Sequence, residues 1–149
     1  MIFISHRGNI NNINESLENK PRYIDNALDL GYHVEIDLWK VDDKLYLGHD
    51  NPTYSINEFF LDNEKLYVHC KNADALEFMV KNSLSCNYFW HQSDNFTITS
   101  NKKIWVHVGK PLIEKSICCL PEQYKNEPNL NVCYGICSDY IEKYSNKYH

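Results

Sequence analysis

Residues 33–38, which read HVEIDL, decide the fold of this chain. Apolar and polar residues alternate strictly along this stretch, which is the pattern of a half-buried β-strand. The alternation places the three apolar side chains on one face and His33, Glu35 and Asp37 on the other. The pattern predicts a strand with an apolar outer face and two carboxylates on its inner face.

Further strands and helices alternate on both sides of this stretch. Residues 2–5 form an apolar run of strand length, and Pro21 begins a helical pattern that Gly31 ends. A turn at residues 42–43 predicts a hairpin, and Asn72 is placed to cap a second helix. Further strands are predicted at residues 66–71, 88–91, 104–108, 117–120 and 134–138.

Strands separated by helical segments are typical of parallel β/α units. The sequence therefore predicts an α/β fold, namely a compressed or incomplete TIM-type (β/α) barrel that points functional groups towards one mouth. A barrel of this type uses about 250 residues, so we expect several helices to be shortened to loops, or a strand to be lost. We find no linker and no repeat, and we expect a single domain over residues 1–149.

Composition and charge exclude several classes of partner. The formal net charge is -5 and no Lys/Arg run is present, which disfavours binding to nucleic acid. No apolar stretch approaches the roughly 20 residues that cross a bilayer, and the residues before His6 leave no room for a signal peptide. The six cysteines form no C-x-x-C pair and are predicted to be reduced. We therefore expect a cytoplasmic protein without nucleic-acid or membrane partners.

Polar side chains gather at the predicted ends of three early strands. Glu35 and Asp37 lie two residues apart, point the same way, and repel each other unless a cation lies between them. A hard divalent metal is the natural occupant of such a site. Arg7 and Lys71 are placed to hold an anion beside it, and histidines are suited to act as acid and base. The histidines of the group are His6, His49 and His69.

Four short motifs follow one another in the first part of the chain. They are His6-Arg7-Gly8, Glu18-Asn19, Glu35-Ile36-Asp37 and His49-Asp50. Their order and approximate spacing resemble the motif of the glycerophosphodiester phosphodiesterase family, and the combination is more specific than any one motif. Residues 104–106 and 135–140 are similar to later strands of that family. The resemblance implies a TIM-type phosphodiesterase barrel, a bound divalent metal and hydrolysis of a glycerophosphodiester-like substrate.

The resemblance also implies a role for each matching residue. It makes His6 and His49 the acid and base pair, with His49 as the acid. It makes Arg7 a ligand of the phosphate group. Glu35 and Asp37 are the implied metal ligands.

Three further positions complete the predicted site. Glu18 is expected near the metal or its waters, and Lys71 is expected to bind the phosphate. Where the family carries a Glu two residues before a Lys, this chain has His69 before Lys71. His69 either ligates the metal directly or only hydrogen-bonds Glu35 or Asp37 without touching the metal. One divalent ion is expected, Mg²⁺, Mn²⁺ or Ca²⁺, and direct ligation by His69 would favour Mn²⁺ or Co²⁺.

Two other functions fit the same residues. One is a catalytically inactive module that binds a phosphate ligand, and the other resembles the sphingomyelinase-D-like phospholipases, which release cyclic phosphates. The sequence leaves open the alcohol groups of the small-molecule substrate, the attack by water or by a substrate hydroxyl, and the pairing of two chains into a homo-oligomer. The residues for which packing is the predicted role are His33, His91, His107, Tyr88, Trp90 and Trp105.

Overall fold

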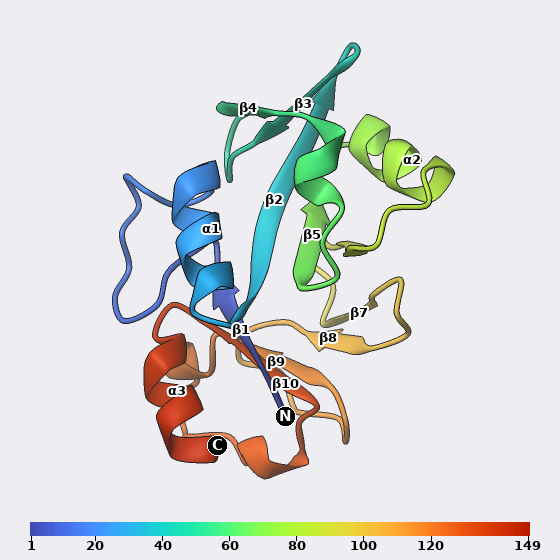
Figure 1. Ribbon diagram of the computed structural model, residues 1–149. Coiled ribbons are helices and arrows are strands. Elements are labelled where there is room, and N and C mark those ends of the chain that lie inside the picture. The colour runs from blue at the N-terminus through green and yellow to red at the C-terminus, as the bar shows by residue number, and fades with distance from the viewer.

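The strands of this chain form one mixed β-sheet that curls strongly into a half-barrel (Figure 1). The computed structural model describes residues 1–149. The strands are β1 (Ile2–His6), β2 (His33–Val41), β3 (Lys44–Leu47), β4 (Tyr54–Ile56), β5 (Leu66–Cys70), β6 (Asn87–Trp90), β7 (Phe96–Ile98), β8 (Ile104–Val106), β9 (Ile117–Cys119) and β10 (Gly135–Ser138). The helices are α1 (Pro21–Asp29), α2 (Ala73–Lys81) and α3 (Ile141–Tyr148), with 3₁₀ turns at η1 (Glu58–Leu61), η2 (Pro121–Gln123) and η3 (Leu130–Val132).

Parallel pairing dominates the sheet. Neighbouring strands run parallel in the order β6-β5-β2-β1-β10-β9-β8. The hairpin strand β3 pairs antiparallel with the far end of β2, and β4 pairs with β3. At the other edge β7 pairs antiparallel with β8. The predicted α/β class is therefore confirmed, and the sheet is mixed because of these antiparallel additions.

The sheet does not close into a TIM barrel, so the expected compressed or incomplete barrel is shown only as far as a strongly curled half-barrel. No ladder joins β6 to β8, and β7 occupies the space between them. Single hydrogen bonds cross that space, from Ser100 N to Tyr88 O at 2.8 Å and from Thr97 Oγ1 to Trp90 O at 2.7 Å. Residues 91–103 form the short strand β7 and turns instead of a helix.

The register of the parallel strands aligns the residues that carry the predicted chemistry. His6 in β1 lies opposite Glu35 in β2, and Asp37 in β2 lies opposite His69 in β5. Because parallel strands end at the same edge of a sheet, these side chains converge at one mouth of the curl. The predicted alternation in residues 33–38 thus places both carboxylates inside the curl.

Apolar side chains fill both the inside and the outside of the curl. One cluster packs β2 and β5 against α1 and α2, and it includes Val34, Ile36 and Leu38 with no exposed surface. A second cluster packs α3 against β1 and β10. The third lies inside the curl, below the site, and includes Tyr67 and Phe89. The three helices cover the outer surface of the sheet (Figure 1), while all six cysteines are free thiols.

Local signals account for the helix ends. Pro21 stands at the first position of α1, and Gly31 follows that helix with a φ of 93°. The Asn72 side chain accepts a hydrogen bond from Ala75 N at 3.1 Å and caps α2, as predicted. The strands β4 and β7 and the helix α3 were not predicted from the sequence.

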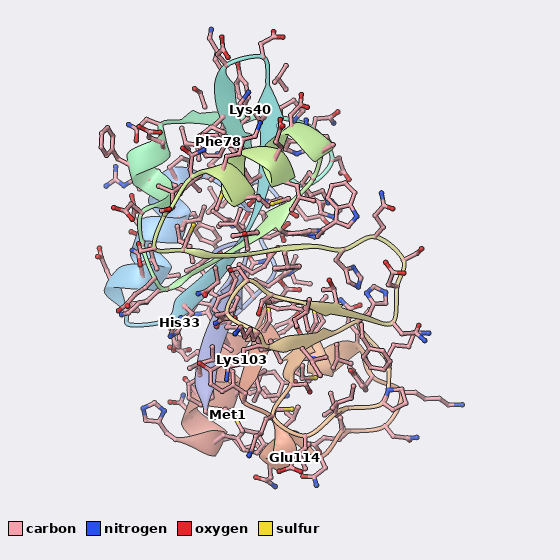
Figure 2. All side chains as sticks on the ribbon, turned by 90° about the vertical axis from the view of Figure 1, so that its right-hand side faces the viewer. Met1, His33, Lys40, Phe78, Lys103 and Glu114 are labelled. Carbon is pink, nitrogen blue, oxygen red and sulfur yellow. The ribbon has the colours of Figure 1, made fainter.

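The tip of the β2–β3 hairpin lies at one end of the molecule, and the beginning of β1 lies towards the other end (Figure 1). Figure 2 shows Lys40 and Phe78 towards one end, and Met1 and Glu114 towards the other. None of the three helices combines the length and the apolar character that crossing a bilayer requires.

Candidate functional site

A cavity of about 370 Å³ opens at the mouth formed by β1, β2, β5 and their neighbours. Six of the eight predicted site residues line it, and they are His6, Arg7, Glu35, His49, His69 and Lys71. Asp37 is buried next to these lining residues and has no exposed surface. Glu18 lines an adjoining cavity, which shares His6, Arg7 and His49 with the first. The structure therefore brings all eight residues into one region.

Asp37 is the most completely surrounded carboxylate of the site. Its Oδ2 accepts a hydrogen bond from Asn19 Nδ2 at 2.9 Å, and its backbone N donates to Asn19 Oδ1 at 2.9 Å. Arg7 Nε lies 3.0 Å from Oδ2, while His69 Nδ1 and Lys71 Nζ lie 3.2 Å and 3.5 Å from Oδ1. Burial alone would raise the pKa of Asp37, but His69, Arg7 and Lys71 lower it well below its ordinary range. Asp37 is therefore a permanent negative charge.

Glu35 is buried beside this charge and lacks comparable partners. Its Oε2 makes no hydrogen bond, and the nearest nitrogens, His6 Nε2 and His69 Nδ1, lie 3.9 Å from its carboxylate oxygens. Burial, followed by the charge of Asp37, raises the pKa of Glu35 to about 8. Without an added cation this carboxyl group keeps its proton at neutral pH.

His69 turns its Nδ1 atom towards both carboxylates. Its Nε2 lies 2.8 Å from the carbonyl oxygen of His91, and a carbonyl only accepts hydrogen bonds, so Nε2 carries a hydrogen. In the neutral imidazole, Nδ1 is then a lone pair that faces Asp37 Oδ1 at 3.2 Å. Two acceptors at this distance need a cation between them, either a proton or a metal ion.

The three acceptors have the spacing of a metal site. One ligand atom from each of Glu35, Asp37 and His69 lies within 4.8 Å of the other two. Glu35 Oε2 and Asp37 Oδ1 are buried without a hydrogen-bond partner, and His69 donates its other ring nitrogen to a backbone carbonyl, as metal-bound histidines do. The residues therefore fit one divalent ion.

His6 is oriented by a residue that the sequence did not single out. Asp139, directly after β10, accepts a hydrogen bond from His6 Nδ1 at 2.7 Å, and Asn9 Nδ2 donates to the same carboxylate oxygen at 2.8 Å. Burial would raise the pKa of Asp139, but the hydrogen bond and charge of His6 lower it overall. Nδ1 of His6 carries the hydrogen that Asp139 accepts. In the neutral ring Nε2 is then the acceptor atom, and it faces Glu35 and the cavity.

Glu18 lies outside the three-residue metal group. Its carboxylate accepts from Asn9 Nδ2 at 2.8 Å and from Arg7 Nη1 at 3.1 Å. Arg7 thus bridges Glu18 and Asp37, and these charges help to raise its pKa above the ordinary value although burial lowers it. Because a guanidinium has five donor hydrogens, two such contacts leave others for a ligand.

The two remaining predicted residues sit at the rim. His49 follows the β3 strand of the hairpin, is 44% exposed in its side chain, and pairs through Nδ1 with Asp50 Oδ1 at 2.8 Å. Burial and the nearby Arg7 charge lower its pKa. Lys71 directly follows β5, where its backbone N donates to Leu38 O at 2.8 Å. Both side chains line the cavity that the metal group faces.

Sequence reasoning missed the residues that hold the site together. They are Asn9, Asn19 and Asp139. Asn19 belongs to the Glu18-Asn19 motif. Asp139 directly follows the strand predicted at residues 134–138, so a polar residue at a strand end was the available signal. Asn9 lies in a loop and gave no signal of its own. The predicted packing residues His91 and His107 also line the cavity.

Comparison with known proteins does not assign a function to this site. No family model, no curated protein and no solved structure matches the chain. The case for a function therefore rests on the side chains of the site.

Proposed function

We propose that this chain is a divalent-metal-dependent phosphodiesterase that uses histidines as acid and base. The observation that carries the proposal is the close approach of three acceptor atoms, from Glu35, Asp37 and His69, at the edge of a cavity that Glu35 and His69 line. Two of these groups are buried carboxylates with oxygens that lack hydrogen-bond partners. Cationic side chains around the same cavity, from Arg7 and Lys71, supply sites for a phosphate anion.

A divalent ion held by these three residues would act as a Lewis acid on the phosphate and would lower the charge repulsion between substrate and site. The donor set admits Mg²⁺ and Mn²⁺ readily, and Ca²⁺ if water completes its shell. Arg7 and Lys71 would bind non-bridging oxygens of the phosphate. Glu18 and Asn9 support this role indirectly, because Glu18 orients the Arg7 guanidinium from 3.1 Å and Asn9 holds Glu18.

His6 has the geometry of a general base. Its Nδ1 hydrogen is fixed by Asp139 at 2.7 Å, so Nε2 is free to take a proton from the attacking hydroxyl or water, and Asp139 would stabilise the imidazolium that results. His49 stands at the rim with its pKa lowered, and in its protonated form it would donate readily to the leaving alkoxide. Each proton transfer of this kind contributes about 10²–10⁴-fold to the rate.

The fold supports a relation to the TIM-type barrels, which we propose as part of the same hypothesis. Successive strands along the chain, β1, β2, β5 and β6, are neighbours in the sheet, and β8, β9 and β10 lead back to β1. The site lies at the carboxyl ends of these strands, where TIM barrels carry their active sites. We infer an abbreviated barrel in which β7 takes the place of one β/α unit.

The proposal is tested by hydrolysis of bis(4-nitrophenyl) phosphate in the presence of Mg²⁺, Mn²⁺ or Ca²⁺, each compared with EDTA. We expect turnover with a metal, and loss of about 10²–10⁴-fold in kcat for His6→Ala. Asp37→Asn should lose the metal response. The matched control is Asp43→Asn, in the exposed β2–β3 turn, which should keep both. Absence of turnover with every metal, together with retained phosphate binding, would instead indicate a binding module.

The role of His49 is tested by changing the leaving group. Nitrophenolate leaves without protonation, so His49→Ala should lose much less activity on the nitrophenyl ester than on an alkyl diester such as a glycerophosphodiester. His6→Ala should lose activity on both. The opposite pattern would exchange the two roles. ³¹P NMR of the alkyl product separates hydrolysis, which gives a monoester, from cyclic-phosphate release of the sphingomyelinase-D-like kind.

A further inference from the structure

The side of the cavity next to the metal group is lined by flat rings. Phe89 of β6 and Trp105 of β8 stack with their ring centroids 4.6 Å apart, and His69 stacks on Phe89 at 5.1 Å with an interplanar angle of 6°. A second stack joins His91 and His107, with centroids 4.9 Å apart and an angle of 23°. All five rings line the cavity that the metal group faces.

The two stacks form two layers because side chains two residues apart on a strand face the same way. Phe89 and Trp105 form the inner layer and are 3% and 4% exposed. His91 and His107 each stand two residues further along, just after the strand ends, and are partly exposed. The inner layer is therefore a buried floor, and the two imidazoles form a wall that a ligand in the cavity can touch.

The histidine wall presents ring faces to the cavity and carries no ion pair. His91 Nε2 donates to the backbone oxygen of Asp94 at 2.9 Å, and neither His91 nor His107 forms an ion pair with a carboxylate. The side chain of His107 makes no hydrogen bond within the protein. The two imidazole rings lie 4.9 Å apart and within 23° of parallel, so they form one continuous flat surface.

The cavity has room for more than a phosphate group. Its volume is about 370 Å³. An apolar protein cavity of about 150 Å³ is sufficient to bind a benzene molecule. A phosphate beside Arg7 and Lys71 would therefore leave space for a ring of that size next to the aromatic layers.

We infer that one alcohol group of the substrate carries a flat, uncharged ring that lies against the imidazoles of His91 and His107, above the floor made by Phe89 and Trp105. This inference rests on the proposed phosphodiesterase function and specifies its substrate class. It favours aryl-bearing or heteroaromatic phosphodiesters over those whose alcohols are both small and aliphatic.

Binding of phosphonates tests this inference without turnover, since their carbon–phosphorus bond is not hydrolysed. Benzylphosphonate and methylphosphonate share the charged group and differ in the ring. With Mg²⁺ or Mn²⁺ present, we expect isothermal titration calorimetry to give about tenfold tighter binding of benzylphosphonate. A third probe, 3-phosphonopropionate, places a second anion where the ring would lie. Equal affinities for the benzyl and methyl compounds, or tightest binding of the propionate, would overturn the inference.

Variants of the wall separate ring stacking from charge. His107→Ala should reduce the benzyl preference towards unity, whereas His107→Phe keeps a flat ring and should retain it. If His107 acted as a cation, the Phe variant would lose binding as the Ala variant does. His149→Ala, at the end of the chain and away from the cavity, is the control and should leave the preference unchanged.

Activity distinguishes this inference from the function on which it rests. Metal-dependent hydrolysis of a methyl diester without preference for a 2-phenylethyl diester would support the function and exclude the ring subsite. Ring-selective binding of phosphonates without hydrolysis of any diester would support the subsite and exclude the phosphodiesterase. The two alkyl diesters have leaving alcohols of similar acidity, so their comparison reports on the ring and not on leaving-group chemistry.

Discussion

At the scale of single residues, the site depends on how a buried negative charge is compensated. Asp37 has no exposed surface, yet Asn19 holds its carboxylate and its backbone, while Arg7 and Lys71 supply positive charge. Glu35, which faces the same space, has no such partners and keeps a proton instead. One carboxylate is thus fixed and charged, and its neighbour is ready to exchange its proton for a metal ion.

The orienting role of Asp139 gives the first prediction. Asp139→Asn removes the charge that holds the Nδ1 hydrogen of His6 and that would stabilise its protonated form. We expect kcat on an alkyl phosphodiester to fall by about 10²–10⁴-fold, with the fold retained by circular dichroism. Asp43→Asn, in the exposed β2–β3 turn, is the matched control, and its loss should stay below about fivefold. Near-normal turnover of Asp139→Asn would exclude an orienting role for Asp139.

The choice of metal at His69 gives the second prediction. An imidazole in place of a carboxylate makes the site softer, so activity should rank Mn²⁺ or Co²⁺ above Ca²⁺, with Mg²⁺ usable. His69→Glu supplies a third carboxylate and should shift the ranking towards Ca²⁺ and Mg²⁺. The measurement is kcat at saturating concentrations of each ion. A native preference for Ca²⁺ that the substitution leaves unchanged would mean that His69 does not ligate the metal.

At the scale of elements, the connection from β1 to α1 shapes the site more than any helix does. Arg7 and Asn19 both adopt left-handed backbone conformations, with φ values of 55° and 61°. A backbone hydrogen bond from Asn19 N to Arg7 O, 3.1 Å long, ties the two ends of this connection together. The strain at these residues is offset by the contacts that both side chains make with Asp37.

A pair of glycine substitutions tests this connection. Gly8 has a φ of 95°, and a Cβ there would lie 2.6 Å from Tyr23 Cδ1, whereas Gly31 has a φ of 93° and open space around it. Gly31→Ala should therefore cost about 1–2 kcal/mol of unfolding free energy, from the backbone alone. Gly8→Ala should cost about 1–3 kcal/mol more, from the steric clash. Urea denaturation measures both, and equal losses would show that Tyr23 moves away freely.

At the scale of the whole molecule, curling of the sheet brings distant parts of the chain to one mouth. His6 from the first strand meets Asp139 from the end of the last, 133 residues away, at 2.7 Å. The hairpin strands β3 and β4 extend β2 and carry His49 back to the rim. The strands β6 and β8 do not pair with each other. His91 directly follows β6, and His107 directly follows β8.

The buried carboxyl of Glu35 links global stability to pH and to metal. Its folded-state pKa, about 8, lies above its ordinary value of 4.5. The folded protein therefore keeps a proton that the unfolded chain releases, and this contribution to stability is full below pH 4.5 and is lost as the pH rises through 8. In EDTA, the difference in unfolding free energy between the native protein and Glu35→Gln should decline from pH 5 to pH 8.5.

A bound divalent ion should reverse this dependence. The metal replaces the proton on Glu35, so a saturating ion should stabilise the protein more at pH 8.5 than at pH 6. At 100 times its Kd the ion adds about 2.7 kcal/mol, or roughly 5–10 °C in Tm for a chain of this length. Asp37→Asn should lose most of this shift. A metal-induced Tm shift that survives in both Asp37→Asn and Glu35→Gln would place the ion elsewhere.

The local pattern of the sequence was enough to predict much of this molecule. Strict alternation in residues 33–38 predicted β2 and the inward direction of Glu35 and Asp37, because a strand has a fixed two-residue period. Pro21 and Asn72 predicted the first turns of α1 and α2. The four motifs supplied six of the predicted site residues, and His69 and Lys71 at the end of a predicted strand supplied two more. The structure places all eight in one region, although their catalytic and metal-binding roles stay predictions.

The sequence by itself determined which residues face inward and which chemistry they carry, because side-chain direction on a strand and the charge of a side chain are local properties. Only the tertiary structure decided that the sheet stops short of a closed barrel, that Glu18 pairs with Arg7 and Asn9, and that Asp139 orients His6. These outcomes depend on the curl and register of strands far apart in the chain. A hydrogen bond between such strands is set by the packing of the whole sheet, which no local pattern encodes.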